Sequence, residues 1–297
     1  MPQKRVMDGA PGGWRLTSPL WTMLKTHIVR LFMTDAARPF LRWAGSKKQI
    51  LSHLAPFWSN ATRYVEPFAG SACLFFRLQP QRAILGDLNK ELISTYRIVR
   101  DFPETVYSEL LEYENSEKEY KRVRSLDPAD LSKIARASRF IYLNRFCFNG
   151  LYRTNLAGQF NVPYGGDRSG SLPRLEQLIA SSKLFRKAKF VQGKFQKTLA
   201  LARKGDFVYM DPPYSVAARR VFKEYDASVF SQKDILDLRT SLERLAKDNI
   251  SFLVSYAESD EADYLATGFN VKRLSVKRHI AGSFANRIPS NEVLIYP

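Results

Sequence analysis

The fold of this chain is indicated most clearly by the stretch Phe207-Val208-Tyr209-Met210-Asp211-Pro212-Pro213-Tyr214. Its first four residues predict a buried strand, so Asp211 stands at the carboxyl end of that strand, where open α/β sheets carry their chemistry. The two prolines remove two backbone donors and leave carbonyl acceptors. A carboxylate, a carbonyl and an aromatic face suit a planar amino group on a nucleobase, because the oxygens accept its two N–H bonds while the ring stacks. This is the chemistry expected for methylation of a base amino group.

Strand and helix patterns alternate on both sides of this stretch. The alternation predicts an α/β fold with a doubly wound, Rossmann-like parallel sheet. The predicted strands lie at residues 63–68, 82–87, 190–191, 206–211, 250–256, 269–276 and 292–296, and the first predicted helices at 72–78 and 88–99. A helical stretch is also expected after Lys47, with Ile50, Leu51 and Leu54 on one face.

Two segments stand apart from the sheet pattern. Residues 101–190 are helix-rich and charged, so we expect one domain made of 34–100 and 191–297 that this helical segment interrupts. Residues 1–33 contain four Gly and Pro within 9–13 and no sustained periodicity, which predicts a poorly ordered leader. Because Met33 directly precedes the first patterned segment, we hypothesise that translation begins there, and the mass of the native N-terminus would decide this.

The charge balance favours a polyanionic partner. The 297 residues include 46 Lys and Arg against 29 Asp and Glu, for a formal charge of +17. Residues 183–204 carry eight basic side chains and no acid, which suits phosphate contacts beside a base pocket. The alternatives are a generally basic surface or an anionic membrane, but no long basic amphipathic helix supports the latter.

The cysteines and histidines are few and scattered. Cys73 and Cys147 lie in apolar surroundings and are expected to be buried free thiols in a reducing compartment. With three histidines besides, a metal site is not expected. No apolar stretch approaches the roughly 20 residues of a membrane span, and no signal peptide is visible, so a cytoplasmic location is expected.

A small-residue turn and a later acid suggest a cofactor site. Residues 68–72 (Phe-Ala-Gly-Ser-Ala) let a ligand approach the backbone closely, although a plain tight turn has the same pattern. Asp87 follows about 20 residues later, where an acid can hold ribose hydroxyls. Alternatively, Asp87 is a helix N-cap. Together the two features suggest a cofactor that contains adenosine.

A second cluster of interest covers residues 144–155. Asn149-Gly150 is a strong turn signal, and aromatic, arginine and amide side chains surround it. Arginine reads guanine, asparagine reads adenine, and an aromatic ring can fill the gap left by a flipped base. The alternative is an ordinary hairpin with a packed aromatic face.

Taken in order over residues 38–297, these segments resemble the DNA adenine N6-methyltransferases of the DNA adenine methylase (Dam) type, D12 class, alpha motif order. Arg42 stands where that family leads us to expect lysine, and Ser46 where it has glycine. The matching segments are Phe40–Lys47, Val65–Ser71, Gly86–Asn89 with Leu92-Ile93, Asn144–Phe146 through Pro163–Gly165, and Asp211–Tyr214.

The resemblance implies S-adenosyl-L-methionine as cofactor and specific site residues. Trp43, Lys47, Phe68, Gly70, Asp87 and Asp211 would bind the cofactor; Asp211, Pro212, Pro213 and Tyr214 would form the catalytic motif; Arg42, Phe148, Asn149, Leu151 and Arg153 would contact DNA. Without the family, Trp43 would be read as a core aromatic and Lys47 as a solvated charge. The resemblance also makes 34–100 and 191–297 the catalytic domain and 101–190 the target-recognition domain, with a hairpin at about 146–165.

The expected reaction is methyl transfer to N6 of a flipped adenine in double-stranded DNA, by a monomer in the nucleoid and without a metal. Alternatives are methylation of amino groups in RNA or of cytosine N4, and a catalytically silent DNA-binding regulator. GATC is the family's default recognition sequence, but Arg42 and the loop at 166–171 leave the sequence read by this chain open. The resemblance also leaves open whether the enzyme acts alone or in restriction-modification.

Overall fold

The computed structural model of the protein describes residues 37–155, 157–213, 230–276 and 290–297. The predicted leader at 1–33, the start at Met33 and the motif residue Tyr214 lie outside these ranges. Residues 36–297 form one compact unit, within which the expected domain boundaries near 100 and 190 stay a prediction. Within the described ranges, no helix has the length and apolar character needed to cross a membrane.

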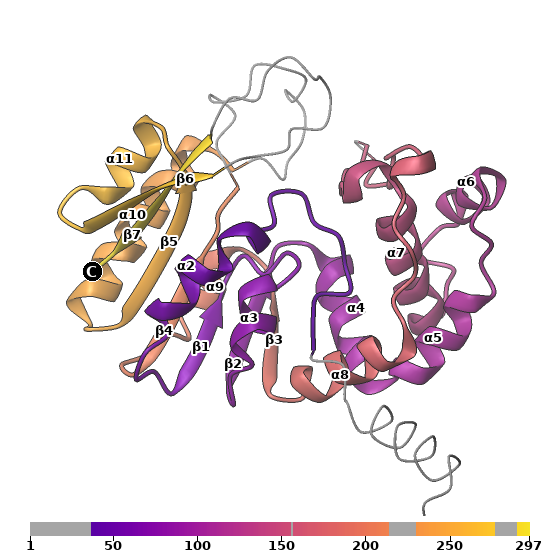
Figure 1. The fold of residues 1–297 in the computed structure, drawn as a ribbon, viewed down its shortest axis with the longest axis horizontal. Helices are drawn as coiled ribbons and strands as arrows, with labels where there is room; N and C mark the ends of the chain where they lie inside the picture. Colours follow the sequence, from indigo (N-terminus) through magenta and orange to yellow (C-terminus); the bar gives the residue numbers. More distant parts are fainter. Residues whose placement is uncertain (1–36, 156, 214–229, 277–289) are drawn as a thin grey trace, which may run out of the picture. The chain divides into compact units, whose positions relative to one another are not determined.

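The described strands form a seven-stranded sheet in the order β3-β2-β1-β4-β5-β7-β6 (Figure 1). β3, β2, β1, β4 and β5 run parallel, and β7 is antiparallel to both of its neighbours. The strand order reverses between β1 and β4, which is the switch point where such sheets bind ligands. The predicted doubly wound, Rossmann-like α/β sheet is confirmed. The strands are β1 Arg63–Glu66, β2 Ala83–Asp87, β3 Ala188–Gln192, β4 Asp206–Met210, β5 Ser251–Ala257, β6 Asn270–Val276 and β7 Ser290–Tyr296.

Helices cover both faces of this sheet. Alternate residues of a strand point to opposite faces, so Tyr64 and Phe207 join one core cluster while Val65 and Val208 join the other. The α-helices are α3 Cys73–Leu78, α4 Lys90–Asp101, α5 Pro103–Leu111, α6 Glu117–Ser125, α7 Lys133–Phe146, α8 Leu175–Phe185, α9 Phe195–Leu199, α10 Gln232–Lys247 and α11 Asp260–Ala266.

The helix expected after Lys47 is broken into three short pieces. They are the 3-10 turn η1 Lys48–Ile50, the helix α2 Leu51–Leu54 and the 3-10 turn η2 Ala55–Phe57, which contains a proline near its start. The expected apolar face still holds, because Ile50 and Leu54 are buried and Leu51 is half-buried.

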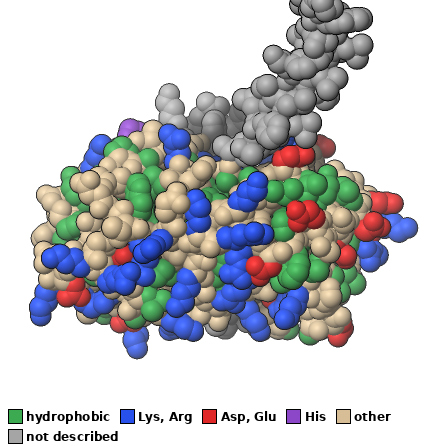
Figure 2. Space-filling model, turned by 90° about the horizontal axis from the view of Figure 1, so that it is seen from below, with side chains coloured by type: hydrophobic (Ala, Val, Ile, Leu, Met, Phe, Trp, Pro, Cys, Tyr) green, Lys and Arg blue, Asp and Glu red, His purple; other side chains and the backbone are tan. Residues whose placement is uncertain are grey.

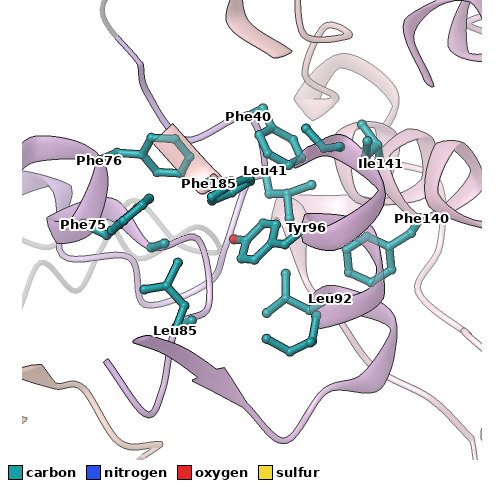
Figure 3. Packing of buried hydrophobic residues seen from close by; sticks show 14 of the residues in the cluster. Phe40, Leu41, Phe75, Phe76, Leu85, Leu92, Tyr96, Phe140, Ile141 and Phe185 are labelled. Atoms are coloured by element: carbon teal, nitrogen blue, oxygen red, sulfur yellow. The ribbon is translucent and has the colours of Figure 1, made fainter. Parts of the chain in front are cut away.

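Aromatic side chains fasten the segment before Lys47 to the helical layer (Figure 3). Phe40 packs edge-on against Tyr96 of α4 with ring centroids 5.8 Å apart, and Phe185 of α8 lies 4.8 Å from the same ring. The Tyr96 hydroxyl donates to the carbonyl of Gly70, so this core cluster also holds the turn that follows β1.

Residues 147–164 fold back on themselves beyond the end of α7. Antiparallel bridges join Cys147 to Tyr164 and Thr154 to Phe160. The short 3-10 turns η3 Phe148–Gly150 and η4 Gly166–Arg168 lie in and just after this segment.

Candidate active site

Three acidic side chains gather at the carboxyl ends of adjacent strands. Glu66 ends β1, Asp87 ends β2, and Asp211 directly follows β4. Because β2, β1 and β4 are neighbours and run parallel, these acids meet at one edge of the sheet, around the switch point.

Lys47 reaches into this edge and binds two carboxylates. Its Nζ lies 2.7 Å from Oδ1 of Asp211 and 3.2 Å from Oε1 of Glu292, which belongs to β7. Lys47 is 6% exposed and Glu292 2%, while Asp211 keeps 22% of its side-chain surface. Lys47 is therefore a buried, paired cation and not the solvated charge of the alternative interpretation.

Glu66 is a deeply buried acid in the same group. Burial raises the pKa of Glu66 well above its usual range, Asp211 and Asp87 raise it further, and the Tyr64 hydroxyl opposes the shift. No hydrogen-bond partner for its Oε2 exists among the described residues. The site therefore contains a carboxyl group that favours its protonated form.

Asp87 fixes the turn after β1 through the backbone. Its Oδ2 accepts from Gly70 N at 3.0 Å, and its Oδ1 accepts from Asn89 N at 2.8 Å. Burial raises the pKa of Asp87, against the lowering effect of these N–H groups. The N-cap of α4 is Asn89, whose side chain accepts from Leu92 N, so the alternative interpretation of Asp87 as the N-cap is wrong.

Gly70 leaves room for the indole of Trp43. It has a φ of +47°, and a Cβ there would stand 2.9 Å from Cδ1 and Nε1 of Trp43. On its other side the indole stacks on Tyr152, with ring centroids 6.2 Å apart and planes within 14°. Trp43 thus connects the turn after β1 with the segment that follows α7.

A buried amide attaches Arg42 to the end of α7. Asn144 Oδ1 accepts from Arg42 N at 2.8 Å, and its Nδ2 donates to Arg42 O at 2.6 Å. The Arg42 guanidinium donates to the Arg145 carbonyl at 3.2 Å, which leaves further donors of its planar fork for other partners. A Cβ on Gly150 would lie 2.5 Å from Arg42 Cβ, so η3 and Arg42 approach closely.

The other residues expected to contact DNA lie in the segment 148–153. Asn149 adopts a φ of +55°, a conformation that asparagine tolerates, and Phe148 lies under the guanidinium of Arg168 at 5.5 Å. Leu151 is 38% exposed. Arg153 is exposed, and its Nε donates to Asn161 Oδ1 at 2.7 Å.

The remaining predicted residues lie at or behind the sheet edge. Phe68 packs against Phe195 and Phe230, with centroids 5.3 and 5.9 Å away. Pro212 is buried and Pro213 exposed. The prediction of buried free thiols is confirmed, and burial raises the pKa of Cys73 and Cys147 to about 11, which makes both poor nucleophiles at neutral pH.

Sequence reasoning missed four residues of this site. Glu66 had a usable signal, because it is an acid inside the predicted strand 63–68, directly before Pro67. Asn144 and Tyr152 lie in the cluster 144–155, but the sequence does not reveal their contacts with Arg42 and Trp43. Glu292 had no signal, because its role depends on a contact with Lys47 across the chain. Among the described residues, no group of three or more His, Cys, Asp or Glu is arranged to hold a metal ion.

Comparison with known proteins gives a consistent picture. The model of the D12 class N6 adenine-specific DNA methyltransferases matches residues 43–280. A type II methyltransferase of Lactococcus lactis subsp. cremoris is 34% identical over 268 residues, covering 87% of this chain and 94% of the relative. A type II methyltransferase of Methanocaldococcus jannaschii is 32% identical (82% and 92% covered), and the DNA adenine methylase of Vibrio cholerae serotype O1 is 31% identical (86% and 95%).

Proposed function

Since the chain belongs to the D12 class of N6 adenine-specific DNA methyltransferases, we propose that it transfers a methyl group from S-adenosyl-L-methionine to N6 of a flipped adenine in double-stranded DNA. The observation that carries the proposal is the position of Asp211. It follows β4 at the switch point, is partly exposed, and is held by the buried Lys47 at 2.7 Å. We propose that the protein acts as a monomer in the cytoplasm.

The chemistry of the edge fits a cationic, adenosine-containing methyl donor. Asp211 and Glu292 pair with Lys47, and Glu66 and Asp87 end the neighbouring strands, so acidic groups outnumber the one buried cation at this edge. A sulfonium or ammonium group is attracted by the ionised carboxylates among them. The unbonded Oε2 of Glu66 suits a bound group. The turn at Gly70 accommodates Trp43, which is assigned to the same site. We assign Trp43, Lys47, Phe68, Gly70, Asp87 and Asp211 to this site.

When bound, S-adenosyl-L-methionine supplies an electrophilic methyl group. The residues of this chain then have to hold the target amine. In the proposal, the Asp211 carboxylate and the Pro212 carbonyl accept its two N–H bonds, which positions the nitrogen and raises its electron density. Lys47 fixes the Asp211 carboxylate in place. Pro213 stiffens the turn, and Tyr214, which lies outside the described residues, is assigned the stack on the base.

The segment 146–165 is assigned to DNA recognition, within a target-recognition region at 101–190 between the two catalytic segments 34–100 and 191–297. Arg42, Asn149 and Arg153 carry the polar groups that read base edges. Phe148 and Leu151 are the apolar side chains available to fill the gap left by the extruded adenine, at a cost of a few kcal/mol for unstacking.

Substitution of Asp211 tests the proposal directly. With genomic DNA and the methyl donor, the wild-type protein should form N6-methyladenine, detected by mass spectrometry of the released nucleosides. Asp211→Ala should lower turnover by about 10³-fold or more while DNA binding survives, because it removes an acceptor for the reacting amine. The exposed Asp248→Ala, at the end of α10, is the matched control and should keep full activity.

Three outcomes would contradict the proposal. The first is N4-methylcytosine as the product. The second is methylation of structured RNA in preference to duplex DNA. The third is substantial turnover by Asp211→Ala, which would remove Asp211 from the reaction even if the product were N6-methyladenine.

A further inference from the structure

We propose that the amino-terminal edge of the sheet is a second DNA-binding surface, which holds a duplex segment other than the one being methylated. Its centre is a row of three exposed cations, Arg82, Lys187 and Lys204, called here the amino-edge row. The proposal goes beyond the proposed reaction and rests on it only for the choice of duplex DNA as the polyanion.

The strand connections bring the amino-edge row together. Arg82 precedes β2, Lys187 precedes β3, and Lys204 lies just before β4. The Arg82 carbonyl accepts from Tyr64 N at 3.0 Å, and the Lys187 carbonyl accepts from Ala83 N at 2.9 Å. The Gly205 carbonyl accepts from Thr62 N at 2.9 Å. Because neighbouring strands lie about 4.8 Å apart, the row spans about 15 Å across β3, β2, β1 and β4.

The surroundings of the row are strongly basic. The turns that enter β1 to β4, at 59–62, 79–82, 186–187 and 200–205, contain no acidic residue, and they add the exposed Arg186 and Arg203. Two acidic residues nearby are already paired. The buried Asp206 is paired with Arg63, and Asp101 accepts a hydrogen bond from Arg100. That hydrogen bond is the main cause of the lowered pKa of Asp101, and the charge of Arg186 lowers it further. Figure 2 views the molecule from this side and shows Lys and Arg side chains gathered across it, with fewer acidic ones between them.

Helix dipoles explain only part of the row. Cations are stabilised near the last turn of a helix, which accounts for Arg77 of α3, for Lys183 of α8 and for Lys187, which directly follows the C-cap of α8. Arg82 and Lys204 lie further beyond the ends of α3 and α9, in turns that contain no acidic residue to pair with them.

The residues of the amino-terminal edge favour a phosphate backbone over a protein as the binding partner. Leu201 is the exposed large hydrophobic residue of the four described turns, so the edge offers little of the apolar centre that protein interfaces contain. A duplex carries one charge per about 1.7 Å with both strands counted, so a 15 Å segment carries roughly nine phosphate charges, of which those on the facing side can meet the row.

A duplex bound at the amino-terminal edge is distinct from the duplex segment whose adenine lies near Asp211. Asp211 follows β4, whereas Lys204 precedes it, and the five residues Asp206–Met210 separate the two edges by about 17 Å. A straight duplex that lies on the carboxyl edge with its adenine near Asp211 does not reach the opposite edge. The row therefore suits a distant part of the same DNA molecule or another duplex.

A two-duplex capture experiment with the full-length protein tests the inference. One duplex of about 20 base pairs is immobilised and saturated with protein, and a fluorescent second duplex is then added. The wild-type protein should retain the second duplex. The variant Arg82→Gln/Lys187→Gln/Lys204→Gln should bind the second duplex about tenfold more weakly. The slope of log K against log salt concentration for this second binding step should fall in magnitude by about 2.7, as expected for three lost phosphate contacts.

The control removes exposed charge elsewhere. Lys233→Gln/Lys272→Gln neutralises two exposed lysines of α10 and β6, which lie outside the region assigned to DNA recognition and outside the four turns, and should capture like the wild type. Equal capture by the control and the amino-edge variant would overturn the inference. So would a wild-type protein that holds one duplex only, or one that binds phosphatidylglycerol vesicles through the row instead of DNA.

The test separates this inference from the proposed function. Lys187 falls at the end of the segment 101–190, but it precedes β3 at the edge opposite Asp211 and is not assigned to base recognition. Methylation of short genomic fragments should therefore stay within about twofold of wild type in the amino-edge variant, because phosphate contacts far from the reacting amine do not hold it. Normal methylation without capture of a second duplex would overturn the surface alone. Capture without any methylation would overturn the proposed reaction and leave the surface standing.

Discussion

Lys47 neutralises part of the negative charge at the carboxyl edge of the sheet. Its ammonium lies between Asp211 and Glu292, and both Lys47 and Glu292 are almost fully buried. Taking such charges out of water is costly, and only the partner groups compensate for that cost. The identity of residue 47 therefore affects folding stability as well as the proposed reaction.

Removing this cation should destabilise the protein. Lys47→Met leaves two carboxylates without it, and we expect the free energy of unfolding in urea to fall by about 3–5 kcal/mol. Lys47→Met/Glu292→Gln should recover part of the loss, since the second change removes one of the stranded charges. Additive effects of the two substitutions would show that the two groups do not interact.

Glu66 predicts a pH dependence of stability at the same edge. Burial raises its pKa in the folded protein, whereas the unfolded chain releases the proton near about 4.3. The folded state therefore binds the proton more tightly, and stability is lost as the pH rises from about 4.3 towards the folded pKa.

Glu66→Gln removes this titration. The variant should be more stable than the wild type at about pH 8, by roughly 1–3 kcal/mol, and the difference should shrink as the pH falls to about 4. Urea unfolding at a series of pH values measures it. A difference that stays constant across the series would exclude Glu66 as the titrating group.

At the scale of elements, the aromatic stack of Trp43 and Tyr152 joins the segment assigned to the cofactor and the segment assigned to DNA. Trp43 precedes η1, while Tyr152 follows η3, so the stack joins two segments that carry different proposed roles. The hydrogen bonds of Asn144 to Arg42 join the same two segments through the backbone.

Tyr152 should therefore affect binding of the methyl donor without touching the reacting atoms. Tyr152→Ala should raise the KM for S-adenosyl-L-methionine by roughly two- to tenfold, the equivalent of an aromatic pair worth 0.5–1.5 kcal/mol. Tyr152→Phe keeps the stack and should behave like the wild type. Steady-state kinetics of both variants give the answer, and an equal rise in both would mean that the hydroxyl and not the stack is needed.

The sequence predicts regular elements better than it predicts partners. β1 is expected at 63–68 and found at Arg63–Glu66, because Pro67 has no N–H with which to continue the ladder. The predicted apolar face after Lys47 is buried as expected, but the predicted single helix is divided into three short pieces. Local periodicity fixes which side of an element is buried, but it holds no information about the carboxylate of Glu292 that Lys47 meets.

At the scale of the whole molecule, a run of basic residues in the sequence does not reveal at which edge of the sheet these residues lie. The basic run at 183–204 is expected beside the base pocket, but its two ends lie at the amino edge, because α8 and α9 each return the chain to the start of a strand. Only its middle part, around Lys194 and Lys197, follows the carboxyl end of β3. In a doubly wound sheet the chain runs to the carboxyl edge along each strand and returns to the amino edge along the following helix. Basic residues that are consecutive in the sequence are therefore divided between the two edges.

The position of β7 between β5 and β6 has a consequence during synthesis. Lys47 leaves the ribosome early, whereas Glu292 leaves it only when β7 has been made, and β6 has no partner in the described sheet until β7 pairs with it and with β5. A nascent or prematurely terminated chain therefore exposes a lysine without its second carboxylate and an incomplete sheet. We therefore expect a chain that ends before β7 to lack methyltransferase activity.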